Sequence, residues 1–189
     1  MFRLALVIFV LLAPLAAAAE VSPKDISARI EAIPIPSITL SDEQFLTGDK
    51  NGKPVTVAGV LRIAQGTGRL PLVVFVAGSG GFAAGNPDVW DRQFEEMGIS
   101  TFTLDGFAAR GITSTVTDQS QFGRLNMVLD LYRALAVLGK HPRVDPARIA
   151  VMGFSRGGMI TLYSSMKRFQ RQWSTGSVEP AAYISLYPA

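Results

Sequence analysis

One pentapeptide carries the strongest chemical signal in this sequence. Gly153-Phe154-Ser155-Arg156-Gly157 fits the pattern G-x-S-x-G, in which a serine occupies a sharp strand-to-helix turn and its hydroxyl points out of the sheet. Strand and helix approach closely at such a turn, so only glycine fits two residues before and after the serine. A predicted strand precedes the pentapeptide and a predicted helix follows it. Ser155 is therefore the candidate nucleophile, with a helix-capping turn serine as the alternative.

A serine nucleophile also needs hydrogen-bond donors for the oxyanion that forms when it attacks a carbonyl carbon. A helix that begins just after Ser155 would direct its first backbone amides at this oxygen, that of Arg156 first. The second donor is expected from the glycine cluster at 77–81, because glycines let the backbone approach a substrate oxygen closely. The sequence thus predicts a nucleophile and an oxyanion site on two separate loops.

Strands alternate with helices along the chain, and this order predicts the architecture. Strands are expected at residues 54–64, 72–76, 99–104, 148–152 and 181–187, and helices at 88–97, 125–138 and 156–169. The strand at 54–64 follows a proline-punctuated segment at 33–36 and is expected to belong to an antiparallel N-terminal hairpin. The remaining alternation predicts an α/β protein with a doubly wound, mostly parallel sheet and helices on both faces.

The first residues have the features of a secretory signal peptide. Arg3 gives a positive start, residues 4–15 form an apolar run, and four alanines at 16–19 form a cleavage zone. The apolar run is shorter than the roughly 20 residues that cross a bilayer. We therefore expect a signal peptide at 1–19, a domain at 20–189, and a protein that is secreted or periplasmic, with no membrane association after the signal is removed.

Composition excludes several classes of function. The full chain carries a net charge of +3, and its Lys and Arg residues do not gather on one predicted face. The sequence therefore offers no basic patch that would bind nucleic acid. The absence of Cys excludes disulfides and thiolate catalysis, and a single His excludes a His-rich metal site. We expect neither a metal nor a cofactor. The oligomeric state cannot be read from the sequence.

Four segments resemble, in chain order, the dienelactone hydrolase family of the α/β-hydrolase superfamily, over roughly residues 55–189. They are Val73-Val74-Phe75-Val76-Ala77-Gly78-Ser79-Gly80-Gly81, Thr103-Leu104-Asp105-Gly106-Phe107 with Arg110-Gly111, His141-Pro142-Arg143-Val144-Asp145 with Arg148-Ile149, and Gly153-Phe154-Ser155-Arg156-Gly157-Gly158. The resemblance implies hydrolysis of a small-molecule ester or lactone through an acyl-enzyme at Ser155. It also implies that the amides of Ser79 and Arg156 hold the oxyanion. A peptidase activity on the same fold is an alternative that the sequence leaves open.

The sequence departs from this family in two ways. Ala77 stands where the family usually has a histidine before the glycine of its oxyanion loop. In this fold the acid and the base follow the nucleophile, yet only Glu179 and no histidine follow Ser155. The family continues through two more strand–helix units beyond the last predicted strand. We therefore expect a partial, C-terminally truncated hydrolase domain that is weakly active or inactive as this chain.

The single histidine is not expected to replace the missing base. His141 precedes the strand at 148–152, whereas Ser155 follows it, so the strand separates them by well over ~15 Å. Proton transfer needs about 3 Å. Glu179 precedes the last strand and is therefore expected, like His141, at the edge of the sheet opposite to Ser155. We interpret His141 as a turn residue.

Three loop residues could contribute to a substrate pocket. Gly80 lies in the glycine cluster, and Asp105 and Arg110 follow the next strand at the same edge of the sheet. For Asp105 a turn cap, and for Arg110 a surface ion pair, are equally compatible with the sequence. Residues 90, 94 and 97 share a helical face and are expected in the core.

Two other functions are compatible with parts of the sequence. The stretch 78–83 matches the dinucleotide fingerprint G-x-G-x-x-A, and Asp105 stands at the position of the acidic residue that binds the ribose. This pattern favours a Rossmann oxidoreductase. That fingerprint must itself open a helix, whereas here helix signals begin only at Asp88. The second alternative is a non-catalytic binding remnant of the hydrolase fold, which is favoured if this chain is the whole mature product.

Overall fold

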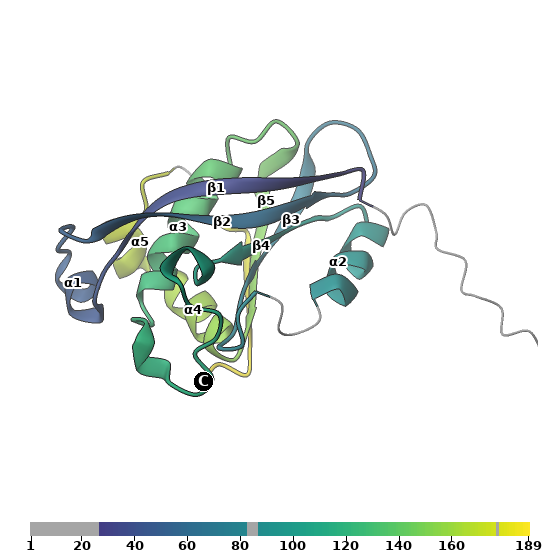
Figure 1. Ribbon diagram of the computed structural model, residues 1–189. Helices are drawn as coiled ribbons and strands as arrows, with labels where there is room; N and C mark the ends of the chain where they lie inside the picture. The colour runs from purple at the N-terminus through teal and green to yellow at the C-terminus, as the bar shows by residue number, and fades with distance from the viewer. Residues whose placement is uncertain (1–26, 83–86, 177) are drawn as a thin grey trace, which may run out of the picture.

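A mixed sheet of six strands in the order β1-β2-β4-β3-β5-β6 organises the protein (Figure 1). The computed structural model describes residues 27–82, 87–176 and 178–189, and the predicted signal peptide lies outside them. The strands are β1 (Arg29–Thr39), β2 (Lys53–Ile63), β3 (Leu70–Val76), β4 (Ser100–Asp105), β5 (Val144–Phe154) and β6 (Ala182–Leu186). The α-helices are α1 (Asp42–Thr47), α2 (Pro87–Glu96), α3 (Asn126–Leu138), α4 (Arg156–Ser164) and α5 (Lys167–Trp173), with short 3-10 turns η2 (Ala108–Arg110) and η3 (Gln119–Gln121). Among the described residues, none of the helices is long and apolar enough to cross a membrane.

The sheet combines an antiparallel and a parallel part, as predicted. β1 and β2 form an antiparallel pair, and β2 is also antiparallel to β4. β3 is parallel to both β4 and β5, and β6 is parallel to β5. β1 contains Pro34 and Pro36, which lack an N–H group, and it accordingly lies at the edge of the sheet. The parallel strands bring the ends of β3 and β5 to one rim of the sheet.

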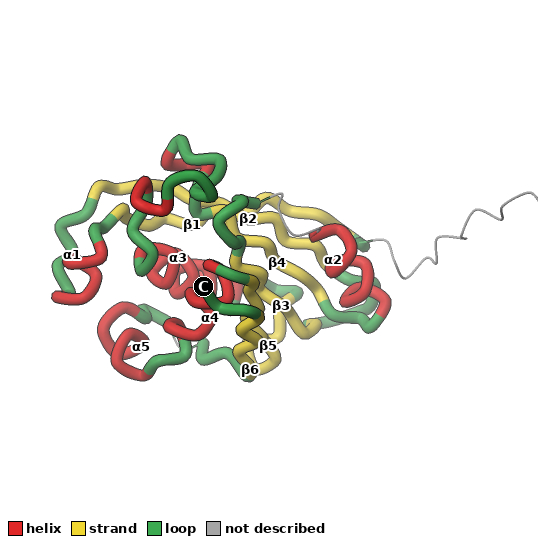
Figure 2. Tube along the Cα trace, turned by 90° about the horizontal axis from the view of Figure 1, so that it is seen from below, coloured by secondary structure: helices red, strands yellow, loops and turns green. Residues whose placement is uncertain are grey.

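Helices cover both faces of the sheet, which confirms the predicted layers. Figure 2 shows α3, α4 and α5 on one side of the strands and α2 on the other. The larger core lies on the side of α3 and α4, where Leu129 and Ile160 are fully buried. A smaller core of Val73, Phe75 and Met152 lies on the α2 side, where Phe94 packs against it. Met97 was expected in the core but is 69% exposed, because α2 ends at Glu96.

The single helix predicted after Ser155 is two helices. α4 ends at Ser164 and α5 begins at Lys167, with Met166 in an extended conformation between them. Ser164 and Ser165 donate side-chain hydrogen bonds to carbonyls in the last turn of α4, at 2.8 and 2.7 Å. Such bonds compete with continuation of the helix. Leu162 in the last turn of α4 and Met166 at the break are 49% and 43% exposed.

A buried carboxylate on α2 predicts a dependence of stability on pH. The Asp91 side chain is 5% exposed and lies 2.8 Å from Arg62 Nε, yet burial raises the pKa of this carboxyl above its ordinary value. A raised pKa means that the folded state binds the proton more tightly than the unfolded state. Protonation of Asp91 therefore stabilises the fold below about pH 4, and this stabilisation is lost as the pH rises through the folded-state pKa. We expect Asp91→Asn to flatten the fall of unfolding free energy with pH in this window. Urea denaturation of both proteins between pH 4 and 7 measures the difference. Identical pH profiles for the variant and the unaltered protein would contradict the prediction.

Candidate active site

Ser155 occupies the turn between β5 and α4 in a strained conformation. Its backbone angles are φ 52° and ψ −123°, and a positive φ is rare for a residue with a side chain. Such strain costs of order 1–3 kcal/mol and persists only where neighbouring structure holds it. The Ser155 amide donates to the carbonyl of Leu186 at 3.0 Å, and the Ser155 carbonyl accepts from Met159 at 3.0 Å. The residue is exposed, as an attacking hydroxyl requires.

The flanking glycines have no room for a side chain. A Cβ atom on Gly153 would lie 2.2 Å from the Gly157 carbonyl oxygen. A Cβ atom on Gly157 would lie 2.1 Å from the carbonyl oxygen of Val76, at the end of β3. Both distances are far below van der Waals contact. The close approach of strand and helix that the G-x-S-x-G pattern predicts is thus present on both sides of Ser155.

The glycine cluster after β3 lies directly beside the serine. A Cβ atom on Gly78 would lie 3.2 Å from the Phe154 carbonyl oxygen and 3.9 Å from the Ser155 Cβ atom. Ser79, Gly80 and Ser155 all line one cavity of about 280 Å³. Within the described residues, no hydrogen bond occupies the backbone amide of Ser79 or that of Arg156. The structure therefore brings together Ser155, Ser79, Gly80 and the start of α4.

The Arg156 side chain is linked by hydrogen bonds to the glycine cluster after β3, a connection that the sequence did not indicate. Its guanidinium is buried, with the residue 1% exposed, and donates to Gln119 Oε1 at 2.8 Å and to the Phe122 carbonyl at 2.7 Å. Gln119 Nε2 in turn donates to Ser79 Oγ at 2.9 Å. The hydrogen-bond partners of the Arg156 side chain among the described residues are the uncharged groups of Thr115, Gln119 and Phe122, and burial lowers the pKa of the guanidinium. A chain of hydrogen bonds thus joins Arg156, the residue after Ser155, to the glycine-rich loop.

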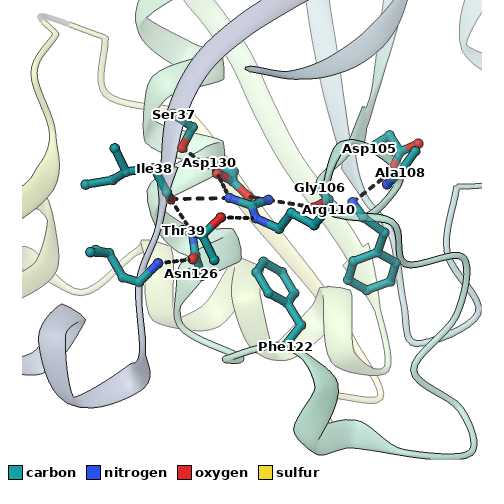
Figure 3. Close-up of polar contacts among 12 residues, drawn as sticks. Ser37, Ile38, Thr39, Asp105, Gly106, Ala108, Arg110, Phe122, Asn126 and Asp130 are labelled. Carbon is teal, nitrogen blue, oxygen red and sulfur yellow. Dashed lines mark hydrogen bonds and ion pairs between the residues drawn. The ribbon is translucent and has the colours of Figure 1, made fainter. Parts of the chain in front are cut away.

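Among the described residues that line the cavity beside Ser155, neither Asp105 nor Arg110 is present, so the structure does not bring them together with the serine. Asp105 caps the turn that follows β4, where its Oδ1 accepts from the amides of Phe107 and Ala108 at 2.8 and 3.0 Å. Arg110 pairs with Asp130 of α3, and the two side chains are 5% and 0% exposed (Figure 3). Its ion pair is therefore buried and not on the surface. Asp105 and Arg110 therefore have structural roles, because neighbouring hydrogen-bond donors and acceptors pair with their side chains.

The two remaining candidates for a base or acid lie away from the serine. His141 precedes β5, with Nε2 3.4 Å from Glu31 Oε2 and Nδ1 accepting from the Arg143 amide at 3.2 Å. Ser155 follows the same strand, whose 11 residues span roughly 30 Å. Glu179 is exposed, pairs with Lys167 and precedes β6. Within the described residues, no group of three or more metal-ligating side chains is present.

Aromatic residues complete the cavity, and only part of this was visible in the sequence. Trp90 of α2 and Phe154 line it, with ring centroids 5.7 Å apart, and Phe75 of β3 forms part of its wall. Helical spacing placed Trp90 on the inner face of α2 but could not distinguish a core position from a cavity wall. Phe154 stands inside the nucleophile motif, where the pattern allows any residue.

Comparisons with known proteins agree with this architecture. A family model described as acetyl xylan esterase (AXE1) matches residues 64–173, more than half of the chain. No curated protein matches the chain significantly. Among solved structures, DcsB in complex with its substrate analogue has 18% identity and a TM-score of 0.54, over 75% of this chain and 42% of that one.

Two further solved structures are similar at lower TM-scores. An acetyl xylan esterase from Paenibacillus sp. R4 has 21% identity and a TM-score of 0.46, over 72% of this chain and 45% of that one. A Klebsiella pneumoniae protein described as a dienelactone hydrolase has 18% identity and a TM-score of 0.49, over 71% of this chain and 55% of that one. The chain thus spans roughly half the length of these proteins. The predicted α/β fold is confirmed by the sheet topology and by the likeness to DcsB, and the family model shows that the chain belongs to the acetyl xylan esterase (AXE1) family.

Proposed function

We propose that this chain carries the nucleophile and the oxyanion site of a serine hydrolase that acts on a carboxylic ester or lactone. The observation that carries the proposal is the exposed, strained Ser155, held beside the glycine cluster after β3. Strain of this kind is costly, and it places one hydroxyl where a substrate carbonyl can meet it. We further propose export by the segment at 1–19, so that the hydrolase works outside the cytoplasm.

The reaction divides into two displacements. Ser155 Oγ attacks the carbonyl carbon and gives its proton to a base, while the carbonyl electrons become an oxyanion that the Ser79 and Arg156 amides stabilise. The electrons return, the bond to the alcohol oxygen breaks, and that oxygen takes up the proton. Water then attacks the acyl-enzyme in the same way, which releases the acid and regenerates Ser155. A lactone opens by the same steps and keeps its alcohol attached.

The base is the part that the described residues do not supply. The one histidine of the sequence lies at the far end of β5, beside Glu31. Serine hydrolases without a base retain only residual rate enhancement, which comes from the oxyanion site and from substrate binding. We therefore expect this chain to acylate slowly and to turn esters over weakly. Because Ser155 is exposed, a small base that diffuses in can reach it.

Labelling of Ser155 with and without added imidazole tests the proposal. A fluorophosphonate probe should modify Ser155 in preference to the other serines, and imidazole should accelerate the modification in proportion to its concentration. Peptide mass spectrometry locates the label, and Ser155→Ala should abolish it. Labelling that is absent, or equal to that of surface serines, would contradict the proposal and favour a non-catalytic binding remnant. Ser165 on the short connection between α4 and α5 serves as an internal reference.

The hydrogen bonds of Gln119 predict a positioning effect on the same reaction. Gln119→Leu removes the link from Arg156 to Ser79, so we expect labelling of Ser155 to slow roughly tenfold, less than the ~10²–10³ that follows removal of an oxyanion donor. Gln119→Glu keeps an acceptor for both partners and should retain most of the rate. Gln121→Leu, in the same exposed turn, is the matched control. Equal rates in all three variants, measured well below their melting temperatures, would contradict this role.

A further inference from the structure

The cavity beside Ser155 has an unusual lining for a site next to a nucleophile. None of its described lining residues is charged. Its walls include the rings of Phe75, Phe82, Trp90 and Phe154, and Val116 lies at the same cavity. The polar side chains among the lining residues are the hydroxyls of Ser79, Thr103 and Ser155. A group that enters this cavity therefore meets apolar surface and aromatic rings.

The size of the cavity exceeds what an acetyl group needs. It measures about 280 Å³, whereas an apolar cavity of about 150 Å³ already accommodates benzene. A carboxylate or a sugar would lose its hydration here without gaining a charged or multiply hydrogen-bonding partner, which costs free energy. An aromatic ring would bury apolar area and pack against the Trp90 and Phe154 rings, whose centroids lie 5.7 Å apart.

We propose that this cavity binds a neutral aromatic substituent of the substrate, of about phenyl size, next to the scissile bond. The proposal rests on the proposed function of Ser155 and specifies its substrate class. It assigns aryl or arylalkyl esters to the site, in preference to acetylated sugars or to lactones that carry a carboxylate. Trp90 is its specificity-determining residue, since it is the largest ring in the lining.

Three sulfonyl fluorides that share one reactive group test this preference. Each reacts when Ser155 Oγ gives its proton to imidazole and forms a bond to sulfur while fluoride leaves. The reagents differ in the group that must occupy the cavity and in intrinsic reactivity. Rates at Ser155, measured by mass spectrometry with imidazole present, are divided by each reagent's rate with free imidazole. We expect phenylmethanesulfonyl fluoride to react at least about tenfold faster than methanesulfonyl fluoride, within the range that pocket complementarity provides. The cationic 4-(2-aminoethyl)benzenesulfonyl fluoride should lose most of this advantage.

Substitution of each tryptophan separates the cavity from general packing. Trp90→Ala should reduce the preference for the phenyl reagent to within about threefold. Trp173→Phe is the matched control, because Trp173 is buried against Phe45 in the other core. It should leave the preference unchanged. Equal normalised rates for the phenyl and methyl reagents in the unaltered protein, or a preference that survives Trp90→Ala, would overturn the proposal.

A binding measurement keeps this proposal distinguishable from the hydrolase function. The sequence has two tryptophans, so Ser155→Ala/Trp173→Phe leaves Trp90 as the single indole reporter in an unreactive protein. Phenylacetamide should change its fluorescence saturably, whereas phenylacetate and acetamide should not at the same concentrations. No response to phenylacetamide would overturn the aromatic site. A response to phenylacetamide without labelling of Ser155 by any reagent would uphold the site and contradict the hydrolase function.

Discussion

Gly157→Ala is expected to destabilise the protein by about 3 kcal/mol, which is the upper part of the range for overpacking a close-packed interior. The new Cβ atom would lie 2.1 Å from the Val76 carbonyl oxygen and 2.9 Å from that of Ala77. Both are backbone atoms at the end of β3, so relief requires α4 to move away from the sheet. That movement would displace Ser155 from the glycine cluster. We therefore expect labelling of Ser155 to be lost along with the stability, as measured by urea denaturation and by the fluorophosphonate probe.

Gly111→Ala is the control for backbone strain alone. Gly111 has φ +72°, and within the described part of the chain a Cβ atom added there would meet no heavy atom within 4 Å beyond its chain neighbours. Alanine at this position would therefore cost about 1–2 kcal/mol through its left-handed conformation. It should leave labelling of Ser155 unchanged. If Gly157→Ala cost no more than Gly111→Ala, the close approach of α4 to β3 would not be what requires glycine at the turn.

The sheet was predictable mainly because two of its central strands contain continuous apolar runs. β3 and β5 have buried apolar residues at consecutive positions, and such runs before glycine turns indicate parallel strands covered on both faces. β4 is buried at five consecutive positions as well, although three of these residues are Ser or Thr. The strand β1 was harder to predict, since Pro34 and Pro36 interrupt its pattern and only an edge position accommodates them. The break between α4 and α5 escaped prediction because apolar spacing continues through Ser164 and Ser165, while their side chains end the helix.

The sharp turn at Ser155 was predictable for a different reason from the contacts around it. The turn at Ser155 depends on neighbours within two positions, so a short pattern captures it. The contacts of Arg156 with Gln119 and of Arg110 with Asp130 join residues 37 and 20 positions apart. No local pattern encodes such pairs, and a single arginine in a loop suggests a surface charge as readily as a buried one. The burial of both arginines became visible only with the tertiary structure.

Arg110→Met is expected to lower the free energy of unfolding by about 3–5 kcal/mol, because it leaves a buried carboxylate without its cation. Arg110 donates to the two carboxylate oxygens of Asp130 at 2.8 and 3.0 Å, to Thr39 Oγ1 at 2.9 Å and to the Gly106 carbonyl at 2.6 Å (Figure 3). It thereby ties the loop after β4 to both β1 and α3. Urea denaturation at pH 7 measures the loss.

The cost of this substitution should depend on pH with a definite sign. Burial already raises the pKa of Asp130, and Arg110 opposes that rise. Without Arg110 the folded-state pKa rises further, so protonation rescues the variant at low pH. The variant's stability should be highest below the unfolded pKa of about 4 and should fall as the pH increases through the raised folded value, so its deficit relative to the unaltered protein widens toward pH 7. A deficit that is constant between pH 4 and 7 would mean that Asp130 is not left as an unpaired charge.

A second substitution at Asp130 tests whether the charge itself is responsible. Arg110→Met/Asp130→Asn removes the carboxylate charge and keeps a side-chain oxygen that can accept from Ser37, which donates to Asp130 at 2.6 Å. The double variant should be more stable at pH 7 than Arg110→Met alone, and its stability should no longer fall between pH 4 and 7. Strictly additive losses would show that Arg110 acts mainly through Thr39 and Gly106. A positive coupling energy would instead identify a charge pair, 20 positions apart in the sequence, as the bond that holds the loop after β4 against α3.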